Sequence, residues 1–134
     1  MAPYTLRVEV TRPYEAAVVA TRAALAEQGF GIISEIDLAA TLRAKLDVDL
    51  PPQLILGACR PQLAYDAIQA DPAIATVLPC NVVVRSTTEG TTTVVEALDP
   101  TAMMGLSDDG ALDTIALDAR QRLAAALATL SHES

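Results

Sequence analysis

The strongest fold signal in the sequence is a pair of apolar segments, residues 81–85 (NVVVR) and 91–98 (TTTVVEAL), with a few polar residues between them. Glu89 and Gly90 lie in this gap, and a polar residue followed by glycine between two strand patterns is typical of a β-hairpin turn. The two strands of a hairpin are antiparallel neighbours. We therefore expect a sheet that contains this antiparallel pair.

Strand and helix patterns alternate along the rest of the chain. Three more segments have the length and composition of strands: residues 5–10 (TLRVEV), 31–37 (GIISEID) and 54–59 (LILGAC). Helices are expected where apolar residues recur at helical spacing: from Pro13 to Gln28, over residues 39–46 and over residues 62–70. Gly29 follows the first of these helices and is suited to the left-handed position that ends a helix.

A long helix is expected over residues 109–130. One apolar stripe follows its length at alternating spacings of four and three residues: Leu112, Ala116, Ala119, Leu123, Ala126 and Leu130. Such a stripe packs on a sheet or against another chain. Asp71 and Asp99, each followed by proline, are predicted to cap the helical turns that begin there.

Five strand segments separated by helices, two of them in a hairpin, predict an α+β fold. We expect a single two-layer domain over residues 1–134, in which a mixed or antiparallel sheet of about five strands packs against helices and the long C-terminal helix. A length of 134 residues fits one hydrophobic core.

The charge balance excludes two classes of partner. The formal net charge of −8 at pH 7 would repel nucleic-acid phosphates and anionic membrane surfaces. No segment has the roughly 20 apolar residues that a membrane span needs. The first ten residues, MAPYTLRVEV, do not have the pattern of a signal peptide, so we expect a cytoplasmic protein with reduced thiols.

Three motifs occur in an order and at spacings that resemble one family. They are GFGIISEID at residues 29–37, ILGAC at 55–59 followed by Pro61 and Ala64, and LPCNVVV at 78–84. The chain resembles the family catalogued as domain of unknown function 302, which implies a compact, dimeric α+β domain without an established activity. It departs from the family pattern at Arg60, where asparagine is common, and at Gln53, where an aromatic residue is usual. The apolar content of 51%, high for a small domain, also favours a homodimer that covers some apolar side chains.

The two cysteines are the first candidates for chemistry. Cys59 ends one predicted strand and Cys80 begins another. If the two strands are antiparallel neighbours, the thiols lie at the same edge of the sheet, and if they are parallel neighbours, the thiols lie at opposite ends. We predict the first arrangement, in which the two reduced thiols approach each other at one edge with Asn81 beside them. A reactive thiolate would need a lowered pKa, which Arg60 or a helix beginning after Pro61 could supply. Alternatively, both cysteines are small buried residues with a packing role.

Metal binding has fewer ligands available. Two cysteines give half of a tetrahedral zinc set, and the only histidine, His132, lies near the end of the chain. Two chains could pool four cysteines across a dimer axis, and a soft ion such as Cu(I) could be held by two thiolates.

Three polar residues complete the candidate site. Glu35 and Asp37 are two positions apart on a predicted strand, so they point to one face and could share a proton or hold a cation. Alternatively, Asp37 caps the helix that follows it. Asn81 opens a strand beside Cys80, where its amide could contact a ligand or a neighbouring turn.

The standard hydrolase, kinase and dehydrogenase patterns are absent, because the sequence has no serine–histidine–acid set and no glycine-rich phosphate loop between a strand and a helix. Two hypotheses remain. The first is a homodimeric binding module that holds a small molecule or a soft metal ion near Cys59, Arg60, Cys80 and Asn81. The second is a thiol-relay or sulfur-carrier enzyme with one cysteine as nucleophile. A purely structural role for both cysteines stays open beside them, and no cofactor is indicated.

Overall fold

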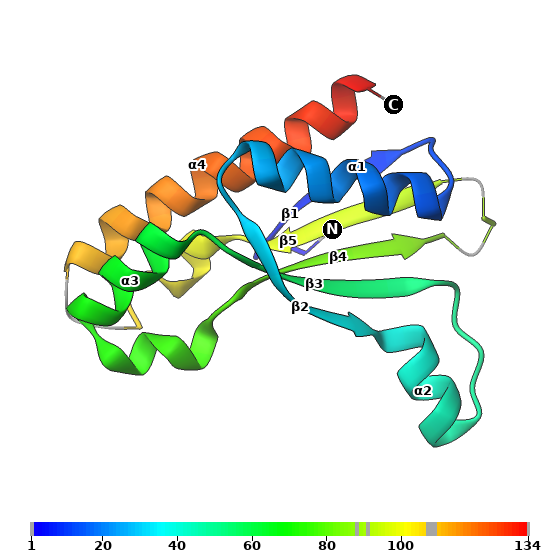
Figure 1. The fold of residues 1–134 in the computed structure, drawn as a ribbon, viewed down its shortest axis with the longest axis horizontal. Helices are drawn as coiled ribbons and strands as arrows, with labels where there is room; N and C mark the ends of the chain where they lie inside the picture. The colour runs from blue at the N-terminus through cyan, green and yellow to red at the C-terminus, as the bar shows by residue number, and fades with distance from the viewer. Residues whose placement is uncertain (1, 88, 91, 107–109, 134) are drawn as a thin grey trace.

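The computed structural model describes residues 2–87, 89–90, 92–106 and 110–133, which form a sheet covered on one face by helices (Figure 1). The strands and helices follow one another along the chain in this order: β1 (Thr5–Val10), α1 (Tyr14–Glu27), β2 (Gly31–Asp37), α2 (Leu38–Leu46), β3 (Gln53–Cys59), α3 (Pro61–Ala70), β4 (Cys80–Ser86), β5 (Thr93–Leu98) and α4 (Gly110–Glu133). Two short 3-10 helices, η1 (Pro72–Val77) and η2 (Pro100–Met103), lie before β4 and after β5. The predicted α+β class, the five strands and the long C-terminal helix are confirmed.

The sheet is antiparallel throughout its described strands. Its spatial order is β1-β5-β4-β3-β2, so the predicted hairpin of β4 and β5 lies near the centre. β3 and β4 are also antiparallel neighbours, although α3 and η1 lie between them in the sequence. Of the two sheet types that the sequence allowed, the antiparallel one is therefore correct. Residues 91 and 109, where we predicted a strand and a helix to begin, lie outside the described residues.

The main core lies between the sheet and the pair α1 and α4. These two helices contact each other and the same face of the sheet (Figure 1). All six residues of the predicted stripe on α4 are buried, at 9% exposed or less. Leu123, Ala126 and Leu130 share the main core with alternate residues of the central strands. Among these strand residues are Leu56, Val82 and Val95, each with no exposed surface. Buried apolar residues thus recur every three or four positions on the helix and every second position on the strands, and the two sets form one apolar layer.

Local capping signals explain several element ends. Gly29 has a φ of 85°, the left-handed region that favours glycine, and α1 ends two residues before it. The Asp37 carboxylate accepts a hydrogen bond from the backbone N–H of Ala40 at 2.9 Å, which begins α2 as predicted. Asp71 and Asp99 cap η1 and η2 in the same way, each accepting from a backbone N–H two residues later.

Two parts of the molecule lie away from the main core. The face of the sheet opposite α1 and α4 carries polar side chains, among them an ion pair of 2.8 Å between Arg85 and Glu96. Helix α2 projects from one end of the sheet with no buried residue of its own (Figure 1). Among the described helices, none is both long and apolar enough to cross a membrane.

Candidate ligand-binding pocket

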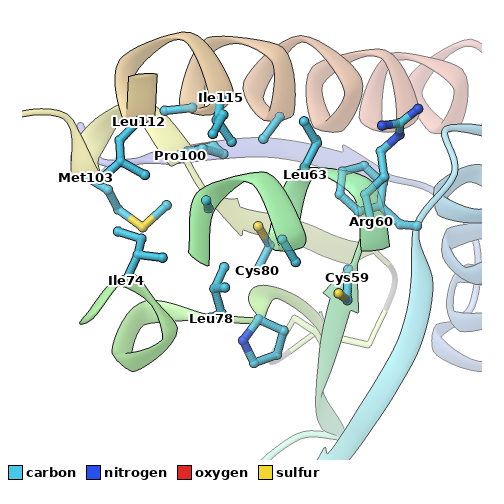
Figure 2. A pocket seen from close by; sticks show the side chains of 17 residues that line it. Cys59, Arg60, Leu63, Ile74, Leu78, Cys80, Pro100, Met103, Leu112 and Ile115 are labelled. Atoms are coloured by element: carbon cyan, nitrogen blue, oxygen red, sulfur yellow. The ribbon is translucent and has the colours of Figure 1, made fainter. Parts of the chain in front are cut away.

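An apolar pocket lies where β3 ends and β4 begins, beneath α3 and α4 (Figure 2). It encloses a cavity of about 60 Å³. Its side chains come from both strand ends, α3, the two 3-10 helices and α4. All but three of the lining side chains are hydrocarbon or thioether, and the three exceptions are Cys59, Arg60 and Cys80.

The pocket exists because α3 leaves the sheet and forms a small second cluster. Ala67 of α3, Ile74 of η1 and Leu112 of α4 are buried together in this cluster, apart from the main core. Small side chains face the space between the two clusters, including Ala58 on β3, and Ala116 on α4. Because alanine fills less volume than leucine at such positions, the two clusters do not close completely on each other.

Cys80 lies at the base of the pocket. It is paired opposite Ala58, on the face of the sheet that also carries Val82 and Val84. Burial raises the pKa of the Cys80 thiol, and a negative charge on Cys59 would raise it further. The thiol of Cys80 is therefore neutral at pH 7, which suits packing or weak hydrogen bonding better than nucleophilic attack.

Cys59 lies at the same end of the sheet, as expected for antiparallel strands, but one register position away from Cys80. It is paired opposite Gly31 on β2, whereas Ala58 is opposite Cys80. Neighbouring positions on a strand point to opposite faces. Figure 2 shows the two sulfur atoms turned in different directions, and both thiols are free.

Arg60 lies at one side of the pocket, directly before α3, where it is the N-cap residue (Figure 2). Its Nε atom is buried without a hydrogen-bond partner. A β-carbon added to Gly29 would lie 2.9 Å from this Nε, so the guanidinium packs on the bare backbone of the turn that ends α1. Glycine at position 29 thus provides both the turn and the space for Arg60.

The remaining candidate residues lie elsewhere. Asn81 is exposed and paired with Gly57, on the sheet face opposite Cys80. Glu35 forms an ion pair of 2.7 Å with Arg22 of α1, and Asp37 caps α2. None of these three residues lines the pocket. Within the part of the chain that the structure describes, no group of three or more histidine, cysteine or acidic residues could hold a metal ion.

Sequence reasoning missed most of the pocket. Leu63, Met103 and Ile115 line it, and nothing marked them as more than apolar residues. Leu112, Ala116 and Ala119 also line it, although we had assigned them to a packing stripe. Residue size along the stripe gave no signal, because Leu112 lines the pocket although it is large, and Ala126 lies in the core although it is small.

The fold and the pocket define a class: a small α+β domain whose five-stranded antiparallel sheet is covered on one face and has an apolar pocket beside its strand ends. Within this class, the chain belongs to the family described as "Domain of unknown function DUF302", whose model matches residues 6–130. The resemblance deduced from the three motifs is therefore confirmed.

A solved structure shows the same fold. The chain is similar to the crystal structure of an uncharacterized conserved DUF302 protein from Bacillus stearothermophilus, with a TM-score of 0.87 and 29% sequence identity. The match covers 96% of this chain and 99% of that one. Comparison with curated proteins finds no match.

Proposed function

We propose that this protein is a homodimeric binding module that holds a small apolar molecule in the pocket beside Cys80. The observation that carries the proposal is the lining of the pocket: apolar side chains from β3, α3, η1, η2 and α4 surround about 60 Å³ of space, with only two thiols and one guanidinium among them. Ligand sites are typically concave, mostly apolar and furnished with a few polar groups. A cytoplasmic location is part of the same proposal, because both cysteines are free thiols, as is usual in a reducing compartment.

The same geometry favours binding over the thiol-relay hypothesis. A relay needs a thiolate, and burial raises the pKa of Cys80. A soft metal ion held by two thiolates would need both sulfur atoms directed at one point. Cys59 and Cys80 instead occupy alternate register positions, and Figure 2 shows their sulfur atoms turned in different directions. A neutral apolar molecule needs neither a thiolate nor a second sulfur.

Binding can be tested with a small neutral probe, 3-methyl-1-butanol, in an NMR titration of the native protein. We expect shifts centred on Leu63, Ile115 and Cys80, and saturation in the millimolar range, because so small a ligand makes few contacts. Ala116→Leu adds three carbon atoms to the pocket wall and should weaken binding at least tenfold. Ala128→Leu makes the same change at an exposed position of α4 and should have no effect.

Three results would contradict the pocket proposal. They are shifts scattered over the surface, a linear response without saturation, or equal affinities for the two variants. Ala64→Leu, which adds the same group from α3, checks that a loss with Ala116→Leu does not come from distortion of α4.

The homodimer is proposed to form through the projecting arm. We define this arm as residues 33–50, from β2 through α2 to the segment before β3. Five large apolar side chains on it are exposed by 41–66%: Ile33, Ile36, Leu46, Val48 and Leu50. The arm also carries both charge signs, with Arg43 paired to Asp47 and to Asp49. An apolar surface with charges of both signs suits a second copy related by a twofold axis.

We expect the protein to sediment as a dimer, at twice the 14.0 kDa of one chain, at micromolar concentration. Leu46→Glu should convert it to the monomer, because a carboxylate would be buried without a partner at the interface. Leu117→Glu, at a leucine of α4 that is also more than half exposed, should leave the dimer intact. A wild-type monomer, or a dimer that only Leu117→Glu dissociates, would contradict the proposed interface.

A further inference from the structure

We infer that the ligand of this pocket is an amphiphilic anion, a short apolar chain with a carboxylate that pairs with Arg60. This inference rests on the proposed function, since it requires a ligand in the pocket. It adds the chemical class of the ligand and the residue that selects it.

The first support is the unpaired charge of Arg60. Six other arginines form ion pairs with a carboxylate: Arg7, Arg22, Arg43, Arg85, Arg120 and Arg122. Among the described residues, Arg60 has no such partner, and its Nε atom is buried without a hydrogen bond. A buried donor without a partner is costly, and a bound acceptor would remove that cost.

The second support is the start of α3, where Arg60 is the N-cap residue. The first turn of this helix has no acidic residue and no side-chain cap. Pro61 occupies the first helical position, and the following backbone N–H groups lie at the positive end of the ten-residue helix. The guanidinium and the helix terminus therefore both favour an anion on the Arg60 side of the pocket, in a protein whose formal net charge is −8.

The third support is the position of Arg60 relative to the apolar lining. Figure 2 shows Arg60 on one side of the pocket and Ile74, Met103 and Leu112 on the other. A molecule that spans the pocket would have its charged end near Arg60 and its apolar end in the cluster around Ile74. Guanidinium groups bind carboxylates through two parallel hydrogen bonds, which fixes orientation as well as charge.

The size of the cavity sets the length of the chain. About 60 Å³ is well below the roughly 150 Å³ of an engineered cavity that holds benzene. It accepts a chain of a few carbon atoms.

The test compares two probes with the same branched carbon skeleton, 3-methylbutanoate and 3-methyl-1-butanol, by NMR titration at pH 7. We expect the carboxylate to bind the wild-type protein about tenfold more tightly than the alcohol, because a charge-assisted pair replaces a neutral contact. Raising the salt concentration should reduce the preference.

The matched variants are Arg60→Gln and Arg122→Gln. Each removes one positive charge, but Arg122 is paired with Asp118 on α4 and does not line the pocket. Arg60→Gln should abolish the preference for the carboxylate and leave alcohol binding within about twofold of wild type. Arg60→Lys should keep part of the preference, and Arg122→Gln all of it. Thermal unfolding of each variant checks that it is folded.

Each outcome decides the inference. Equal or tighter binding of the alcohol to the wild-type protein overturns the anion assignment and leaves the proposed function standing. An equal loss of both probes in Arg60→Gln overturns it as well, because Arg60 would then only support the structure. If neither probe binds the wild-type protein in the pocket, the proposed function and the inference both fail.

Discussion

Replacing Leu123 by alanine should lower the free energy of unfolding by about 3–4 kcal/mol, the usual cost of truncating a fully buried leucine. Leu123 has no exposed surface and lies at the centre of the stripe on α4, where the helix packs on the sheet and on α1. The substitution removes apolar area from the core, and the side chains around it cannot collapse fully into the space.

Leu117→Ala is the matched control, because it makes the same change on the same helix at a residue that is 54% exposed. It should cost less than about 1 kcal/mol. Urea unfolding curves of both variants measure the difference, and the slope of the transition should stay the same. Similar losses for Leu117→Ala and Leu123→Ala would mean that the face of α4 has been assigned wrongly.

The elements of this fold could be predicted because their signals are local. β2 occupies the predicted residues 31–37, since the strand lies between a glycine turn and a helix cap that are both visible in the sequence. Asp37 caps α2 through a backbone N–H only three residues away. Such contacts depend on neighbours in the chain, so a single sequence contains them.

The pairing of β3 with β4 could not be predicted in the same way. The segment between Cys59 and Cys80 is long enough to connect β3 and β4 either as antiparallel or as parallel neighbours. Packing decides between the antiparallel and the parallel arrangement. Helix α3 lies against α4, and η1 then returns the chain to the end of the sheet where β3 ended. This packing joins residues that are about 50 positions apart.

The faces of the two cysteines illustrate the limit most clearly. We predicted that both thiols lie at one end of the sheet, and the strands place them there. Whether the two thiols lie on the same face of the sheet depends on the register between β3 and β4. A shift of one residue in this register would move one thiol to the other face. The observed register pairs Ala58, not Cys59, with Cys80. Likewise, the unpaired Nε of Arg60 follows from contact with Gly29, more than 30 positions away, which no local pattern reveals.

Gly57 should not tolerate even one added carbon atom. Gly57→Ala is expected to lower the free energy of unfolding by about 2 kcal/mol, within the range for an overpacked site. A β-carbon at this position would overlap the Ser34 Oγ atom on β2 and lie 2.8 Å from Cγ of Pro79. In a strand without such neighbours, alanine would be slightly better than glycine, so a loss of stability would come from these contacts.

Gly110→Ala is the control for this prediction, because a β-carbon there meets no atom within 4 Å. It should be neutral or slightly stabilising in α4. Ser34→Ala combined with Gly57→Ala should recover part of the loss, since it removes the overlapping hydroxyl but leaves the rigid ring of Pro79 in place. Urea unfolding of the four variants, including Ser34→Ala alone, gives the coupling between the two positions. Equal stabilities of Gly57→Ala and Gly110→Ala would show that β2 and Pro79 can move away from Gly57. Because Pro79 lines the pocket beside Cys80, that movement would also change the shape of the proposed binding site.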